Sequence, residues 1–133
     1  MLLSVLPEEF TVCRLPEGAR FPEGKWCFTG VTQEERSLVC PAHLVPAQTL
    51  AREDGWRGFY VNEGALDFSL IGILADISRV LAEARVGIFV ISTFNTDYIF
   101  VKANQLNTAV SALKAADYTF VEHKSEDSPA RSK

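Results

Sequence analysis

Two polar segments of the chain carry the residue types that bind a small charged molecule. Residues 92–97, Ser-Thr-Phe-Asn-Thr-Asp, lie between two apolar runs and offer hydroxyls, an amide and a carboxylate, which can hold an α-amino group or a polar side chain. Residues 66–70, Leu-Asp-Phe-Ser-Leu, lead into an amphipathic stretch, where the first turn of a helix would present free backbone N–H groups to a carboxylate. Together the two segments predict an amino-acid site. Its candidate ligand-binding residues are Leu66, Asp67, Phe68, Ser69, Leu70, Ser92, Thr93, Phe94, Asn95 and Asp97.

A simpler interpretation of the same residues stays open. Asp67 and Ser69 can do no more than cap a helix, because each side chain can accept a hydrogen bond from the orphan amides of the first turn. Thr93, Asn95 and Asp97 can do no more than satisfy the polar groups of a tight connection between strands. The residue types alone leave both interpretations open.

Catalytic chemistry has little support in the sequence. His43 and His123 are the two histidines, and Cys40 with His43 is conceivable as a nucleophile pair because thiolate activation needs a nearby base. The glycines at 64 and 72 are isolated rather than arranged in a phosphate-binding loop, and the carboxylates are not clustered at metal-ligand spacing. We therefore expect no enzyme activity, no catalytic residues, no metal and no cofactor.

The elements that must position the two polar segments follow from the hydrophobic pattern after residue 55. Residues 56–61 alternate in strand fashion, whereas Ile77, Val80 and Leu81 recur at helical spacing and form one buried stripe. Gly87 is expected to end this helix with a left-handed angle. The sequence predicts strands at 56–61, 88–91, 97–102 and 118–122, helices at 68–85 and from Asn104 or Asn107, and a central position for the two middle strands. The order β-α-β-β-α-β is that of an α+β, ferredoxin-like fold.

The polar run between the middle strands also resembles a known family. Ser92, Thr93, Phe94 and Asp97 match the pattern Ser-Thr-Phe-x-x-Asp of ACT domains in the tandem-ACT branch related to the cytosolic arginine sensor. The resemblance covers about residues 56–122. It implies an effector held at an interface between two ACT units, by the loop between the first strand and first helix of one unit and the second strand of its neighbour. It also implies a homo-oligomer.

The first 50 residues have a different character. Turn signals such as Pro16-Glu17-Gly18 and Pro22-Glu23-Gly24 recur along them, and Pro7 adds a further break, so the intervening strands should stay short. We expect a shorter, β-rich ACT-like lobe at 1–50, a linker within 47–55, an ACT domain at 56–122 and a mobile tail at 123–133.

Composition excludes several classes of partner. The formal net charge is −4 and the basic residues are scattered along the chain, which argues against nucleic acid. No apolar run approaches the roughly 20 residues that span a bilayer, and residues 1–6 lack the charged start of a signal peptide, so we expect no membrane partner and a cytoplasmic location. Cys13, Cys27 and Cys40 lie in strand-like runs and are expected to be buried free thiols.

Two functions from different classes follow from this pattern. The first is a small-molecule binding regulatory module that senses an amino acid at an interface between ACT units. The alternative is a homodimeric structural or protein-interaction module with no ligand. A polar, concave site at Asp67 and Asp97 would favour the first, and a dry apolar interface around Phe94 would favour the second.

Overall fold

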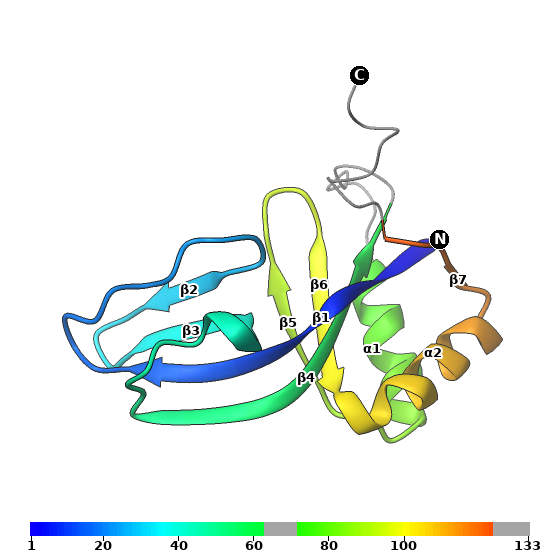
Figure 1. Cartoon of the computed structure of the whole chain (residues 1–133). Helices are drawn as coiled ribbons and strands as arrows, with labels where there is room; N and C mark the ends of the chain where they lie inside the picture. Colours follow the sequence, from blue (N-terminus) through cyan, green and yellow to red (C-terminus); the bar gives the residue numbers. More distant parts are fainter. Residues whose placement is uncertain (63–71, 124–133) are drawn as a thin grey trace.

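The computed structural model describes residues 1–62 and 72–123, which form one curled sheet and two helices (Figure 1). The elements are β1 (Leu2–Leu15), β2 (Phe28–Val31), β3 (Arg36–Pro41), β4 (Ala51–Val61), α1 (Ile73–Glu83), β5 (Ile88–Ser92), β6 (Asp97–Lys102), α2 (Leu106–Ala115) and β7 (Thr119–Phe120), with short 3-10 turns at Ala42–Leu44 and Ala103–Gln105. No helix of this described part is long and apolar enough to cross a membrane. The predicted α+β, ferredoxin-like fold is confirmed.

The sheet has the strand order β2-β3-β1-β4-β6-β5, with β7 added in parallel to the start of β1. β4, β5 and β6 carry the two helices on one face, as a ferredoxin-like unit requires. The position on the other side of β4 is taken by β1, which runs antiparallel to it from Leu3 opposite Val61 to Arg14 opposite Ala51. The short C-terminal β7 therefore lies beside β1 rather than beside β4. β5 is an edge strand of this sheet, so the predicted central position was wrong for it.

The long strands β1 and β4 join the two halves of the chain. Residues 51–55, expected within a linker, belong to β4, and Pro7 does not end a strand but lies inside β1. The ladder between the two strands shifts register between Val5 and Glu9, so Pro7 falls where no ladder hydrogen bond is needed. The sheet is therefore continuous across the expected boundary near residue 50, and the division into two lobes stays a prediction.

The alternation of side chains along β4 and β6 separates two apolar layers. Phe59 and Val61 lie under the helices with Ile99, as the alternating pattern predicts. The helices contribute the predicted stripe to this layer, with Ile77 and Leu81 of α1 fully buried. On the opposite face of the sheet the side chains of β4, β5 and β6 include five buried or half-buried rings. We call this layer the aromatic face; it consists of Trp56, Tyr60, Phe89, Tyr98 and Phe100.

The N-terminal strands cover part of the aromatic face. Phe10 of β1 meets Phe100 edge to face at 5.1 Å between ring centroids, and Phe28 of β2 lies 5.1 Å from Tyr98. The register shifts in β1 and β4 bend the two strands, and such bulges increase the local twist of a sheet. The β-rich N-terminal part thus packs its own rings against the face that the helices leave uncovered.

Both helices end in the same backbone motif. In α1 the N–H of Val86 donates to Leu81 O at 2.9 Å and that of Arg85 donates to Ala82 O at 3.0 Å, which is a Schellman arrangement. Arg85 adopts the left-handed angle, φ 64°, so the prediction that Gly87 would do so was wrong. α2 repeats the arrangement with Asp117 at φ 76°. The predicted first turn of α1, with its cap at Asp67 or Ser69, lies outside the described residues, and the described helix begins at Ile73.

Candidate functional site

The turn between β5 and β6 is closed by its own threonines. The backbone N–H of Thr93 donates to Thr96 O at 2.9 Å, and the Thr93 hydroxyl donates to the same oxygen at 3.0 Å. The Thr96 N–H in turn donates to Thr93 Oγ1 at 3.4 Å. The Thr93 side chain is therefore occupied in the turn, as the simpler interpretation of this residue predicts.

Asp97 and Ser92 face each other across the base of the turn. They are register partners, and the Ser92 hydroxyl donates to Oδ1 of Asp97 at 2.6 Å. Asp97 is half-buried and Ser92 exposed. The hydrogen bond uses one of the two carboxylate oxygens and fixes the orientation of the group. The pair can thus present a fixed negative charge at the surface to an ammonium or guanidinium group.

Two side chains of the turn project into solvent. Asn95 is exposed, and Phe94 is 87% exposed at the tip of the turn. A lone exposed ring is unremarkable by itself, but this one lies two residues from Ser92 and three from Asp97. Phe94 therefore adds an apolar surface beside the polar pair, which either a ligand or a second protein chain could cover.

Thr96 connects the turn to the end of β4. Its side chain is buried, and its hydroxyl donates to Val61 O at 3.1 Å. The next residue, Asn62, is held in place by two further contacts, because its N–H donates to Leu2 O at 2.8 Å and its side-chain amide donates to Ser4 Oγ at 2.7 Å. Sequence reasoning missed Thr96, since its role depends on where β4 ends.

The structure therefore gathers one of the two predicted segments. Residues 92–97 form the turn between β5 and β6, and Thr96 holds this turn against the last residue of β4. In the sequence, the second predicted segment, residues 66–70, follows β4. The five candidates of that second segment, Leu66, Asp67, Phe68, Ser69 and Leu70, lie outside the described residues.

The conceivable nucleophile pair is not an activated one. Cys40 is fully buried, and burial, together with the neighbouring Cys27 and Cys13 thiols, raises its pKa to about 12. His43 is exposed and lies 3.7 Å from Glu8, between Nδ1 and Oε1. A thiol with so high a pKa is protonated at neutral pH and is a poor nucleophile. All three cysteines are free; Cys13 and Cys40 are buried as predicted, and Cys27 is half-buried.

His123 and three rings form a further group that the sequence did not predict. His123 was expected in the mobile tail, but its Nδ1 lies 3.0 Å from the Tyr60 hydroxyl, and its ring lies 5.3 Å from that of Trp26. Tyr60 and Tyr98 are register partners on β4 and β6. The alternation of β4 shows that Tyr60 faces away from the helices, but nothing local to the sequence brings residues 26 and 123 beside it.

The second half of the chain is similar to a known family. Residues 51–115 match the ACT domain family, over a segment that begins at the first residue of β4.

Solved structures of other proteins have a similar fold. Protein Atu0741 from Agobacterium tumefaciens is 26% identical with a TM-score of 0.80, over 93% of this chain and 94% of that chain. Aspartate kinase from Synechocystis is 14% identical with a TM-score of 0.63, over 95% of this chain and 28% of that chain. The regulatory subunit of aspartate kinase from Thermus thermophilus, in its ligand-free form, is 9% identical with a TM-score of 0.58, over 86% of this chain and 95% of that chain.

Proposed function

We propose that this chain is a non-catalytic, cytoplasmic regulatory module that binds an amino acid at an interface between ACT units. The two polar segments, residues 66–70 and 92–97, would form the site, and a second copy of the chain would complete it. The resemblance of residues 92–97 to the arginine-sensor branch supports an amino acid as the ligand in this proposal. The similarity to a regulatory subunit of aspartate kinase supports a regulatory role, through the fold.

One observation carries the proposal. The hydrogen bond from Thr96 to Val61 O keeps the turn at the exit of β4, and the Ser92–Asp97 pair fixes a carboxylate there. A carboxylate held by a neighbouring hydroxyl is suited to a cationic or α-ammonium group. The loop after β4 would supply the backbone N–H groups for the ligand carboxylate.

The alternative is a homodimeric interaction module without a ligand, and two observations favour it. Phe94 is 87% exposed, and β5 is an edge strand that carries no charged residue and three half-buried apolar residues beside Phe89. Such edges are templates for pairing with another chain. Both the amino-acid-binding module and the interaction module require a second copy, so sedimentation at micromolar concentration should show a dimer. A 14.7 kDa monomer would contradict the requirement for a second copy in both proposals.

Ligand binding separates the two readings. The full chain is melted in the presence of each of the twenty amino acids, because a ligand that binds the folded state raises stability by RT ln(1 + [L]/Kd). We expect one amino acid, or a chemically related group of them, to raise the melting temperature. Asp97→Asn keeps the size of the side chain and an acceptor for Ser92 but removes the charge, so it should strongly reduce this rise. Asp117→Asn, at the end of α2, is the matched control. No rise with any amino acid, or an equal rise in Asp97→Asn, would contradict the proposal.

A further inference from the structure

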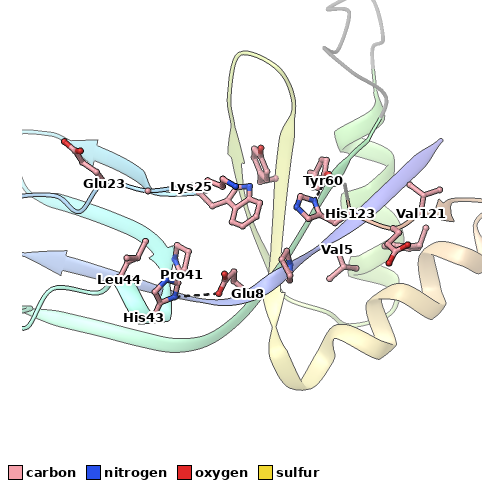
Figure 2. A pocket seen from close by; sticks show the side chains of 16 residues that line it. Val5, Glu8, Glu23, Lys25, Pro41, His43, Leu44, Tyr60, Val121 and His123 are labelled. Carbon is pink, nitrogen blue, oxygen red and sulfur yellow. Dashed lines mark hydrogen bonds and ion pairs between the residues drawn. The ribbon is translucent and has the colours of Figure 1, made fainter. Parts of the chain in front are cut away.

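A large open cavity is lined by Tyr60 and Tyr98 of the aromatic face, together with residues of β1, of the chain around Trp26 and His43, and of residues 120–123. Its volume is about 1170 Å³, which exceeds the 300–1,000 Å³ typical of small-molecule sites. Figure 2 shows Tyr60 and His123 on one side of it and Glu8, His43 and Leu44 on the other. The cavity thus lies between the N-terminal strands and the ACT domain. Asp97 and Ser92 do not line it, because Tyr98 and Asp97 point to opposite faces of β6.

Four half-buried rings form a connected series along the cavity. Trp26 lies 5.3 Å from His123, His123 lies 5.9 Å from Tyr60, and Tyr60 lies 5.7 Å from Tyr98, between ring centroids. The Tyr60–His123 hydrogen bond of 3.0 Å holds the middle of the series in place. Ring faces carry partial negative charge, so partly buried rings around a cavity attract cations.

Trp26 is held in an uncommon backbone conformation. Its φ is +61°, a region that bulky residues rarely adopt and that costs free energy. Nearby Gly24, at φ +155°, leaves room for Leu44, whose Cδ1 would lie 3.0 Å from a Cβ at this position. The loop thus accepts strain in a conformation that turns the Trp26 ring toward the cavity. Strain of this kind is found where a side chain must be aimed.

The ionisable groups of the cavity carry an excess of negative charge. Glu8, Glu23 and Glu122 line it with Lys25 and the two histidines, and His43 Nδ1 lies 3.7 Å from Glu8 Oε1. Burial and the nearby Lys25 lower the pKa of His123, so this ring is neutral at pH 7. A low-dielectric wall of rings focuses the field of the carboxylates into the cavity. The cavity therefore favours a cation over a neutral or anionic molecule of the same shape.

We propose that this cavity binds an organic ammonium ion with an apolar or aromatic body. The ammonium group would lie against the ring faces of Trp26 and Tyr60, within the field of Glu122 and Glu23, and the body would cover Val5 and Leu44. The site is separate from the turn at residues 92–97, and it does not depend on the proposed amino-acid site.

Three probes of matched body and different charge test the proposal. 2-Phenylethylammonium, 2-phenylethanol and 3-phenylpropionate are titrated into the full chain, and the indole N–H signals of Trp26 and Trp56 are followed by NMR. Trp56 does not line the cavity and serves as an internal control. We expect a saturable shift at Trp26 with the ammonium probe, and binding at least about fivefold weaker with the other two. No saturable shift at Trp26, or equal binding of the three probes, would overturn the proposal.

Two pairs of variants assign the contributions. Trp26→Leu removes a ring from the cavity, and Phe21→Leu removes a half-buried ring outside it. Glu122→Gln removes a carboxylate from the rim, and Glu83→Gln removes one from the outer side of α1. We expect Trp26→Leu and Glu122→Gln each to weaken binding of the ammonium probe several-fold, with binding of 2-phenylethanol unchanged in Glu122→Gln. If all four variants bind the ammonium probe as the parent does, the assignment of the cavity is wrong. Asp97→Asn should leave this binding unchanged, which separates the result from that of the proposed function.

Discussion

The replacement Gly58→Ala tests the packing of the aromatic face, two of whose rings, Tyr60 and Tyr98, line the cavity. A Cβ at Gly58 would lie 2.8 Å from Cε2 and 3.0 Å from Cδ2 of the Phe100 ring. Phe100 is fully buried, stacked on Phe89 at 4.8 Å and met by Phe10 at 5.1 Å, so its ring has little room to retreat. The φ of Gly58 is not in the left-handed region, and alanine is therefore acceptable to the backbone.

The magnitude follows from two opposing effects of Gly58→Ala. Overpacking of a well-packed core costs about 1–3 kcal/mol, and the lower entropy of an unfolded chain with alanine returns roughly 0.5–1 kcal/mol. We expect a net loss of about 1–2 kcal/mol in the free energy of unfolding, which corresponds to a fall of roughly 3–12 °C in Tm at about 3–6 °C per kcal/mol.

Thermal and urea unfolding of Gly58→Ala and of a control variant measure this loss. Gly30→Ala lies in β2, where a Cβ would meet nothing within 4 Å, so it should be neutral or slightly stabilising. A smaller side chain at position 100 would make room for the new Cβ. The double variant Gly58→Ala/Phe100→Leu should therefore lose less stability than the sum of the two single variants. If Gly58→Ala is as stable as Gly30→Ala, the packing of Phe100 described above is wrong.

Three further outcomes are expected. Cys40, buried and with its pKa raised to about 12, should react slowly with a thiol reagent in the native protein and fast in denaturant; rapid native labelling would return the nucleophile reading. Burial lowers the pKa of His123 from 6.5, so the unfolded state binds its proton first and the free energy of unfolding should fall as the pH drops below about 6.5; a His123→Gln variant with the same slope between pH 7 and 5 would refute this. Arg85→Gly should raise the free energy of unfolding by roughly 0.5–1 kcal/mol, because φ 64° is strained for arginine, and a loss of stability in urea unfolding would contradict the motif.

The fold of residues 56–115 could be predicted from the sequence because its signals are local. The apolar stripe of Ile77, Val80 and Leu81 indicates which face of α1 is buried, and the alternation of residues 56–61 separates the two faces of β4. The polar run at 92–97 likewise predicts a turn, and the structure has one there. Periodicity and turn chemistry act over a few residues, so they can be recognised without knowing what lies across the fold.

The contribution of the N-terminal half could not be predicted in the same way. Residues 51–54, Ala-Arg-Glu-Asp, lack the apolar alternation of a strand, and their side chains are exposed. They belong to β4 because they pair with β1, nearly 40 residues earlier in the chain. Pro7 indicates the end of a strand, but β1 continues through it because Pro7 lies in the register shift between Val5 and Glu9. For the same reason Thr96 and His123 were missed, because their partners, Val61 and Tyr60, are distant in the sequence. Non-local pairing decides these positions, and no short pattern records it.

The affinity of the Asp97→Ala variant for the amino acid, compared with that of the parent, is the most direct test of the proposed function. The amino acid that gives the largest rise in Tm is titrated calorimetrically into the parent and the variant, and the Tm of each is measured without ligand. A charge-assisted contact contributes about 1.5–3 kcal/mol, so the affinity of Asp97→Ala should fall roughly tenfold to a hundredfold, with a change in Tm of no more than about 3–6 °C for the loss of the Ser92 hydrogen bond. A variant that melts lower but binds the amino acid as tightly as the parent would show that Asp97 only stabilises the turn, and would contradict the proposed site.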